Sequence, residues 1–257
     1  MTKKSKVILI VLISFAVTGL AFIFPPIAQD PAYHDFADKR GLLGIPNFSD
    51  VMSNLFFMFF GFMGMRTVFK NRNDTNVFVI KEESILWEVF FVGTFLVGFG
   101  SGYYHLEPNN HTLVWDRLPM TIAFMAIISL VVMLRISEKA GLYLFPLFLI
   151  AGAGSVFYWD YTESLGRGDL RPYALVQFLP MLLLPLILWL LPARYYSGLK
   201  YPVYALLWYG LAKILEHFDS EIFEMTGRMV SGHTLKHIAA AIAVYVMVVF
   251  VQKRKLL

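Results

Sequence analysis

Long apolar runs, separated by short polar connections, recur along the whole chain. A helix of roughly 20 apolar residues crosses the hydrocarbon core of a bilayer, and each run approaches that length. The runs are continuous, whereas the strands of a membrane β-barrel alternate apolar and polar positions over about ten residues. The pattern therefore predicts an all-α membrane protein. The predicted spans are residues 6–24, 51–70, 84–105, 114–134, 141–159, 173–192, 201–217 and 233–251.

The first run differs from the seven that follow it. Three lysines precede it and two prolines end it, as in a signal peptide, although the run is long for one and lacks small residues at a cleavage site. We interpret it as an uncleaved signal anchor, with a cleaved signal peptide as the alternative. The predicted organisation is an N-terminal segment 1–24, an extracytoplasmic loop 25–50 and a seven-helix transmembrane bundle 51–252.

Composition supports this interpretation. Of 257 residues, 58% are hydrophobic and 16% are charged, whereas about a quarter are charged in soluble proteins. The net charge of +4 does not indicate nucleic-acid binding, because the basic residues stand in loops between the predicted spans. The chain has no cysteine, which excludes disulfides and thiolate metal ligands.

The basic residues are unevenly distributed between the two ends of the predicted bundle. The end that holds residues 1–5, called the terminal end below, has 14 of the 22 basic residues and five of the 18 acidic ones. The positive-inside rule places this end, with the C-terminus, in the cytoplasm. The 14 residues are Lys3, Lys4, Lys6, Arg66, Lys70, Arg72, Lys81, Arg135, Lys139, Arg194, Lys200, Lys253, Arg254 and Lys255.

At the opposite end, polar residues stand inside the predicted spans. Ionisable groups within a membrane helix are costly and usually functional. Because successive spans alternate in direction, all of these residues are predicted to lie on one side of the membrane at similar depth. They are Ser53, Asn54, Ser101, His105, Asp116, His233 and His237. This end is called the histidine end below, and the charge rule makes it extracytoplasmic.

Three of the histidines fit a metal site. His233 and His237 are four residues apart, so they share one helix face with the spacing by which a helix supplies two zinc ligands. Such a pair alone is weak evidence, but His105 adds a third imidazole, and three histidines with one open position typify catalytic zinc. Copper, iron and nickel are alternatives. Of the other histidines, His34 and His111 are expected to be solvated and His217 to be interfacial.

Asp116 follows His105 across a short turn. Helices joined by a short loop are usually antiparallel neighbours, so the carboxylate is expected to approach His105. It would either orient a ligand imidazole or act as a general base. The alternative is an ion pair with the adjacent Arg117.

Four motifs together resemble the alkaline ceramidases, over roughly residues 33–245. More distantly, they are similar to the adiponectin-receptor-like proteins of the same membrane hydrolase superfamily. The resemblance indicates a bacterial-type member. The motifs are Val51-Met-Ser-Asn-Leu-Phe56, Gly98-Phe-Gly-Ser-Gly-Tyr-Tyr-His105, Trp115-Asp-Arg-Leu-Pro-Met120 and His233-Thr-Leu-Lys-His237.

The resemblance implies a seven-helix core with zinc on His105, His233 and His237, and with Ser101 and Asp116 as its other site residues. It implies an amidohydrolase that takes ceramide from the bilayer and releases sphingosine and a fatty acid. In this hypothesis Ser101 donates a hydrogen bond to the oxyanion and Asp116 moves the proton.

Members of the family that these motifs resemble can also carry a calcium site before the first core helix. Asp35-Phe-Ala-Asp38 resembles the acidic start of that site, but Arg40 and Asn47 depart from its pattern. The Asp-Arg pair at 116–117 likewise departs from the Asp-Glu of animal members, which leaves the exact substrate open.

Three other functions are alternatives to the ceramidase prediction. One is a hydrolase of the same mechanism on another lipid, such as an N-acyl amino acid or an acyl ester. A second is a membrane receptor or sensor with a structural zinc. A third is a transporter, which inverted repeats and broken helices would mark, and the sequence shows neither.

Overall fold

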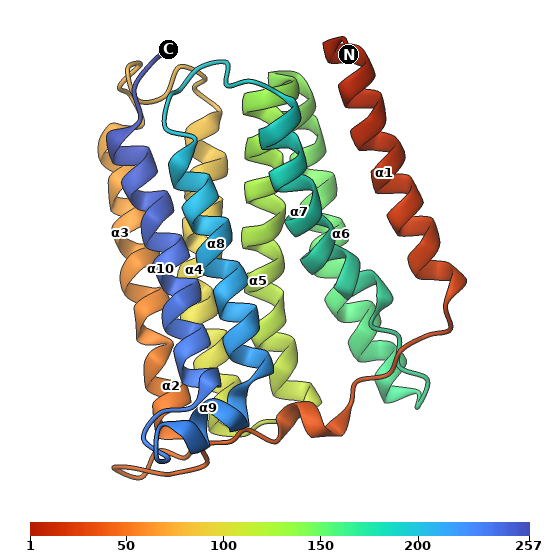
Figure 1. The fold of residues 1–257 in the computed structure, drawn as a ribbon, viewed down its shortest axis with the longest axis vertical. Coiled ribbons are helices and arrows are strands. Elements are labelled where there is room, and N and C mark those ends of the chain that lie inside the picture. The colour runs from red at the N-terminus through yellow and green to blue at the C-terminus, as the bar shows by residue number, and fades with distance from the viewer.

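The computed structural model describes residues 1–257 and is helical, without a β-sheet (Figure 1). This confirms the predicted all-α fold. A 3₁₀ turn covers Pro31–His34, and the π-helical stretch Val132–Ile136 extends the fifth helix. The helices are α1 Lys3–Ile23, α2 Phe48–Ser53, α3 Leu55–Asn71, α4 Glu83–Leu106, α5 Asn110–Val131, α6 Glu138–Ser164, α7 Arg171–Leu190, α8 Lys200–His217, α9 Asp219–Met225 and α10 Gly232–Lys253.

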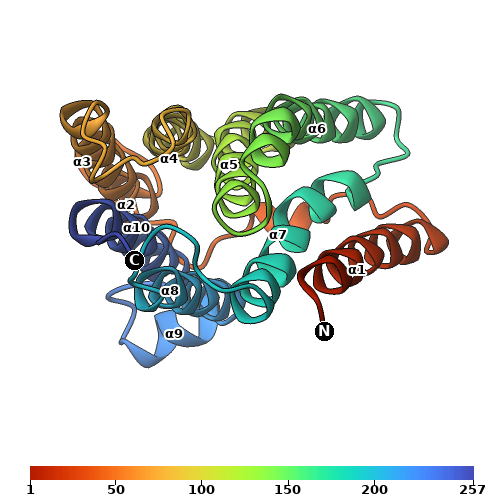
Figure 2. The same cartoon turned by 90° about the horizontal axis from the view of Figure 1, so that it is seen from above.

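The long helices stand in two rows when the bundle is seen from above (Figure 2). One row contains α3, α4, α5 and α6, and the other contains α10, α8, α7 and α1. The N- and C-termini lie at the same end of the bundle (Figure 1), as the alternating spans predicted. Every predicted span corresponds to a helix, and α2 with α3 makes up the second.

Seven of these helical segments are long and apolar enough to cross a membrane, and α1 is one of them. The helix α8 is not in this set, although it lies in the bundle beside α10 (Figure 1). It carries three charged residues, Lys200, Lys213 and Glu216, within 18 positions. Two of these three charges lie near its C-terminal end, which is at the histidine end of the bundle.

The helix α1 lies at the edge of the bundle against α7 (Figure 2). Ile10 is its only buried residue, and large apolar side chains such as Phe15 are exposed. Exposed apolar residues along a helix of this length are what a lipid-facing span requires. The helix is thus an addition to the side of the remaining bundle.

Residues 24–47, called the cap segment below, cross the histidine end between α1 and α2 (Figure 1). Its first half is tied to the α6–α7 connection, because Leu170 N donates to Ile27 O at 2.8 Å. Its second half is tied to α9, because Ala37 N donates to Asp219 Oδ2 at 3.0 Å. The cap segment therefore covers the residues that the sequence placed at this end.

Candidate metal centre and lipid cavity

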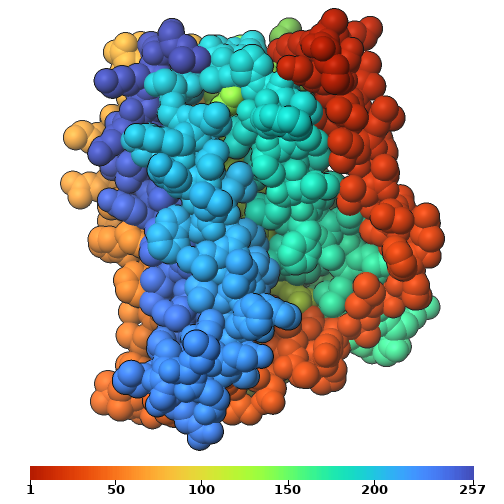
Figure 3. Space-filling view, viewed as in Figure 1, coloured from red at the N-terminus to blue at the C-terminus, as the bar shows by residue number.

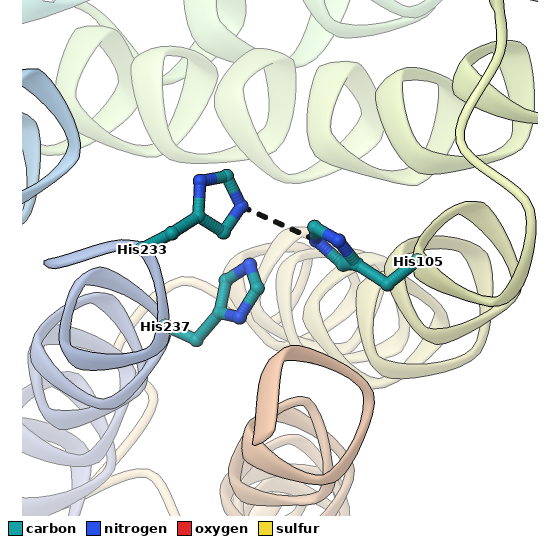
Figure 4. A group of neighbouring side chains, drawn as sticks. All are labelled: His105, His233 and His237. Carbon is teal, nitrogen blue, oxygen red and sulfur yellow. Dashed lines mark hydrogen bonds between the residues drawn. The ribbon is translucent and has the colours of Figure 1, made fainter. Parts of the chain in front are cut away.

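The three predicted histidine ligands meet at one point. His105 lies in the last turn of α4, and His233 and His237 lie in the first turns of α10. All three are buried, and their ligand nitrogens lie within 4.8 Å of one another. Figure 4 shows the three rings turned toward a common centre, with 3.3 Å between Nε2 of His105 and Nε2 of His233. Three nitrogen donors in this arrangement could hold a metal ion.

Backbone contacts fix the two helix ends that carry these histidines. Ser231 caps α10 by accepting from Thr234 N at 3.0 Å, and Asp219 accepts from His233 N at 2.7 Å. Asn47 donates its amide to His105 O at 2.8 Å, at the end of α4. Helix termini leave backbone groups without partners, and these side chains supply them. The histidine backbones are thereby held in place before any ligand binds.

Ser53 sets the tautomer of His237. The Ser53 hydroxyl donates its only proton to Asp50 O at 2.9 Å, so its oxygen accepts from His237 Nδ1 at 2.8 Å. With the proton on Nδ1, the lone pair of Nε2 is free for a metal. The Asp50 carboxylate accepts from Thr234 Oγ1 at 2.6 Å, which ties α2 to α10.

The cap segment closes the site from outside. The ring of Phe36 lies 4.6 Å from that of His105 and 4.3 Å from that of His233, centroid to centroid. His34 bonds to the Tyr104 hydroxyl at 2.8 Å and to Asn110 Oδ1 at 2.9 Å. The expectation that His34 is solvated is therefore wrong, because the folded cap segment gives it two partners that are far away in sequence.

A long cavity leads away from His237 between α4, α5, α7, α8 and α10. It has a volume of about 1360 Å³ including its opening, and 21 of its 30 lining residues are hydrophobic. Ser101, Asp116 and His237 line it at the histidine end, and Leu188 and Met247 line it toward the terminal end. In Figure 3, yellow-green atoms of the α4–α5 region show between the teal α7 and the blue α8. The apolar walls of the cavity are thus suited to an aliphatic chain.

Close packing of α4 on α5 positions Ser101 beside Asp116. A Cβ atom on Gly100 would stand 1.9 Å from Trp115 O on α5, and one on Gly98 would stand 2.3 Å from a side-chain carbon of Met58 on α3. A Cβ on Gly102 would meet nothing within 4 Å. Glycines at the first two positions are therefore required for the helices to approach, whereas Gly102 is not.

The structure separates Asp116 from Arg117. The Asp116 side chain approaches the Ser101 hydroxyl and makes no hydrogen bond to the three imidazoles. Arg117 points away, donates to Gln29 Oε1 at 2.6 Å and lies 4.1 Å from the centroid of the Trp159 ring. The alternative of an Asp116–Arg117 ion pair is not favoured, because the guanidinium is engaged by the cap segment and aromatic rings.

The acidic residues of the cap segment do not form a calcium site as they stand. Arg40 donates to both carboxylate oxygens of Asp38, at 2.7 Å each, and Lys39 pairs with Asp35. The hydrogen bonds from Arg40 hold the pKa of Asp38 below its usual range. A calcium ion needs six to eight oxygen ligands, and here a guanidinium already occupies the buried carboxylate.

Several residues around the site were not anticipated as part of it. Phe36, Asn47, Asp50 and Asp219 cover or brace the histidines through the contacts described above. Asp50 had a signal in the sequence, because it is an acid beside the start of an apolar run. Phe36 and Asn47 lie in the cap segment and Asp219 begins the short helix α9, so none of these three belongs to an apolar run.

A comparison with curated protein sequences finds no match. The model of one family, described as Ceramidase, matches residues 44–256. The matched region contains the whole bundle except α1, with all three histidines, Ser101 and Asp116. Since the match covers most of the chain, the protein belongs to the ceramidase family.

Proposed function

We propose that the protein is a zinc-dependent integral membrane amidohydrolase that cleaves ceramide-like lipids into a long-chain base and a fatty acid. One observation carries the proposal: His237, one of three convergent imidazoles, lines the polar end of a long apolar cavity. A lipid amide fits both parts, because its chains require apolar walls and its amide requires a polar reaction site.

The donor geometry suits zinc. Two nitrogens bound to one tetrahedral zinc at 2.0–2.1 Å lie about 3.3–3.4 Å apart, and Nε2 of His105 lies 3.3 Å from Nε2 of His233. Three histidines leave one of four positions open, as in catalytic zinc sites. Zinc in such a site supplies an activated water, because it lowers the pKa of bound water to about 7.

The positions of Ser101 and Asp116 suit them to stabilise the oxyanion and to transfer the proton. Both line the cavity beside His237. In the proposed reaction, water oxygen bonds to the amide carbonyl carbon while Ser101 donates a hydrogen bond to the developing oxyanion. Asp116 accepts the water proton and passes it to the amide nitrogen as the carbon–nitrogen bond breaks. Its lack of a hydrogen bond to an imidazole supports this role over that of orienting a ligand.

The charge distribution supports an extracytoplasmic position for this site. Most basic residues stand at the terminal end, which the positive-inside rule assigns to the cytoplasm with the C-terminus. In the proposed orientation, the lipid enters from the bilayer between α7 and α8. Its polar head remains at the histidine end and its chain follows the apolar cavity.

The first test measures bound metal by mass spectrometry on detergent-purified protein. We expect about one zinc per chain in the wild type and none in His233→Ala/His237→Ala. His217→Ala is the matched control, because His217 is exposed and lies outside the cluster. A well-folded wild type without zinc would remove the proposed mechanism.

The second test measures turnover on a panel of ceramides, N-acyl amino acids and acyl esters with the same chain. We expect ceramide to be cleaved, His105→Ala to lose both zinc and turnover, and Ser101→Ala to lose turnover while it retains zinc. Cleavage of another panel member alone would replace ceramide as the substrate. Bound zinc without turnover of any lipid would favour a receptor.

A further inference from the structure

Three charged side chains form a cluster on the cavity wall beside the metal centre. Lys236 Nζ on α10 lies 2.6 Å from Glu216 Oε1, and Lys213, one turn before Glu216 on α8, pairs with Glu216 Oε2. All three line the same cavity as Ser101 and Asp116. Their side chains are 35% exposed for Lys213 and 18% exposed for Lys236 and Glu216.

The cluster has unused donors, and each oxygen of its one carboxylate, that of Glu216, already accepts from a lysine. Each ammonium has three N–H groups, of which one is bonded to Glu216, so donors remain on both lysines. An ion pair that only joined α8 to α10 would need one lysine. The second lysine adds a positive charge to the cavity, whose other walls are largely apolar and carry the carboxylate of Asp116.

The position of the cluster indicates which part of a bound lipid it would contact. Lys236 immediately precedes the metal-site residue His237, and Lys213 lies at the α7 side, 5.7 Å from the centroid of the Phe178 ring. The cavity beyond them, toward the terminal end, is apolar. A lipid whose amide faces the histidines and whose chain fills the apolar part would have its head group beside the two ammoniums.

We propose that Lys213, Glu216 and Lys236 form a head-group subsite that binds hydrogen-bond-accepting oxygens on the amine side of the lipid amide. Glu216 holds the two ammoniums at the cavity wall, and their remaining N–H groups donate to the lipid. Such oxygens occur as the hydroxyls of a long-chain base or as the carboxylate of an N-acyl amino acid. The inference rests on the proposed function for the placement of the amide.

The test compares three lipids with the same acyl chain: an N-acyl sphingosine, its analogue without the C1 hydroxyl, and an N-acyl glycine. Equilibrium binding is measured on the full-length protein in the Asp116→Asn background, and kcat and KM are measured with Asp116 intact. The variants are Lys213→Met, Lys213→Arg and, as a matched control, Lys200→Met at the other end of α8. Metal content is measured in each.

A hydrogen bond to a charged group contributes enough to favour an oxygen-bearing lipid by about 10- to 100-fold. We expect the wild-type protein to prefer the N-acyl sphingosine to its deoxy analogue by a factor of this size. Lys213→Met, which leaves only the donors of Lys236, should reduce the preference severalfold, mainly through KM, with metal content unchanged. Lys213→Arg, which retains donors, should keep most of it, and Lys200→Met should keep all of it.

The outcomes separate the subsite from the proposed function. If Lys213→Met weakens all three lipids by one factor, or changes none, the cluster is structural and the inference fails. If binding shows the preference but no lipid is hydrolysed, the subsite stands and the proposed function fails. A preference for the sphingosine lipid identifies a hydroxyl as the bound group, and a preference for the glycine lipid identifies a carboxylate.

Discussion

Charged residues are buried at both ends of the bundle, but their hydrogen-bond partners differ between the two ends. At the terminal end, Glu83 and Arg254 are paired with both side chains wholly inaccessible. Tyr196 donates to the same carboxylate at 2.7 Å and Trp87 donates to it at 2.8 Å. At the histidine end, the ammonium groups of Lys213 and Lys236 line a cavity, and each has N–H groups beyond the one bonded to Glu216.

The difference distinguishes structural from functional polar groups. A buried charge with several partners joins segments that are distant in sequence, here the start of α4 and the residue after α10. Buried polar groups normally have hydrogen-bond partners, so those that lack them beside a cavity indicate a ligand. We therefore expect substitutions at the terminal end to lower stability and substitutions at the histidine end to lower activity.

The largest expected effect is that of Asp116→Asn. The amide retains the shape of the side chain but cannot accept the water proton, so kcat should fall by about 10²–10⁴-fold. Zinc content and melting temperature should remain close to wild type, because Asp116 makes no hydrogen bond to the imidazoles. A parallel loss of melting temperature and activity would instead show that Asp116 is structural.

Glu83→Gln is expected to lower stability and leave activity unchanged, which is the reverse of the result expected for Asp116→Asn. Removal of the carboxylate charge leaves the Arg254 guanidinium buried without a counter-ion, which typically costs about 3–5 kcal/mol. The midpoint of unfolding in detergent should fall, whereas kcat per folded molecule should not change. The exposed neighbour Glu82 provides the control, since Glu82→Gln should leave stability unchanged. Equal effects of the two substitutions would contradict the assigned role of Glu83.

Gly100→Ala tests the packing that brings Ser101 to Asp116. The added methyl would meet Trp115 O at 1.9 Å and push α4 from α5, and overpacking of this kind costs about 1–3 kcal/mol. We expect lower stability together with lower kcat. Gly102→Ala is the matched control, because its methyl would meet nothing within 4 Å. It should be neutral or slightly stabilising, since alanine favours the helix by up to about 1 kcal/mol.

The smallest effect is expected from the Asp38–Arg40 pair, which is partly exposed on the arginine side. Because Arg40 lowers the pKa of Asp38 in the folded state, the pair stabilises the protein above the unfolded pKa of about 3.9. This contribution is lost as the pH falls through the folded-state pKa. The melting temperature of wild type should therefore exceed that of Asp38→Asn at pH 7, and the gap should close in acid.

A control for this prediction lies three residues earlier. Asp35 pairs with Lys39, but both side chains are largely exposed, at 69% and 65%. Asp35→Asn should therefore leave the melting temperature unchanged at either pH. A gap between wild type and Asp38→Asn that is independent of pH would exclude the ion pair as its cause. Added calcium should not raise the melting temperature of the wild type.

Much of the fold could be predicted from the sequence, because each span is encoded locally by its length and hydrophobicity. The family and the all-α membrane architecture are confirmed. The meeting of His105, His233 and His237 also followed, since alternating spans place their helix ends on one side. The prediction for His34 failed because its partners Tyr104 and Asn110 are about 70 positions away.

The sequence by itself determined the spans, the end of the bundle that carries the chemistry, and the candidate ligands. Only the tertiary structure decided which polar groups satisfy one another and which face a cavity. It paired Asp38 with Arg40, separated Asp116 from Arg117, and placed Lys213 and Lys236 on either side of Glu216. These outcomes depend on the directions of side chains on helices that pack together, and a one-dimensional pattern of polar and apolar residues does not contain that information.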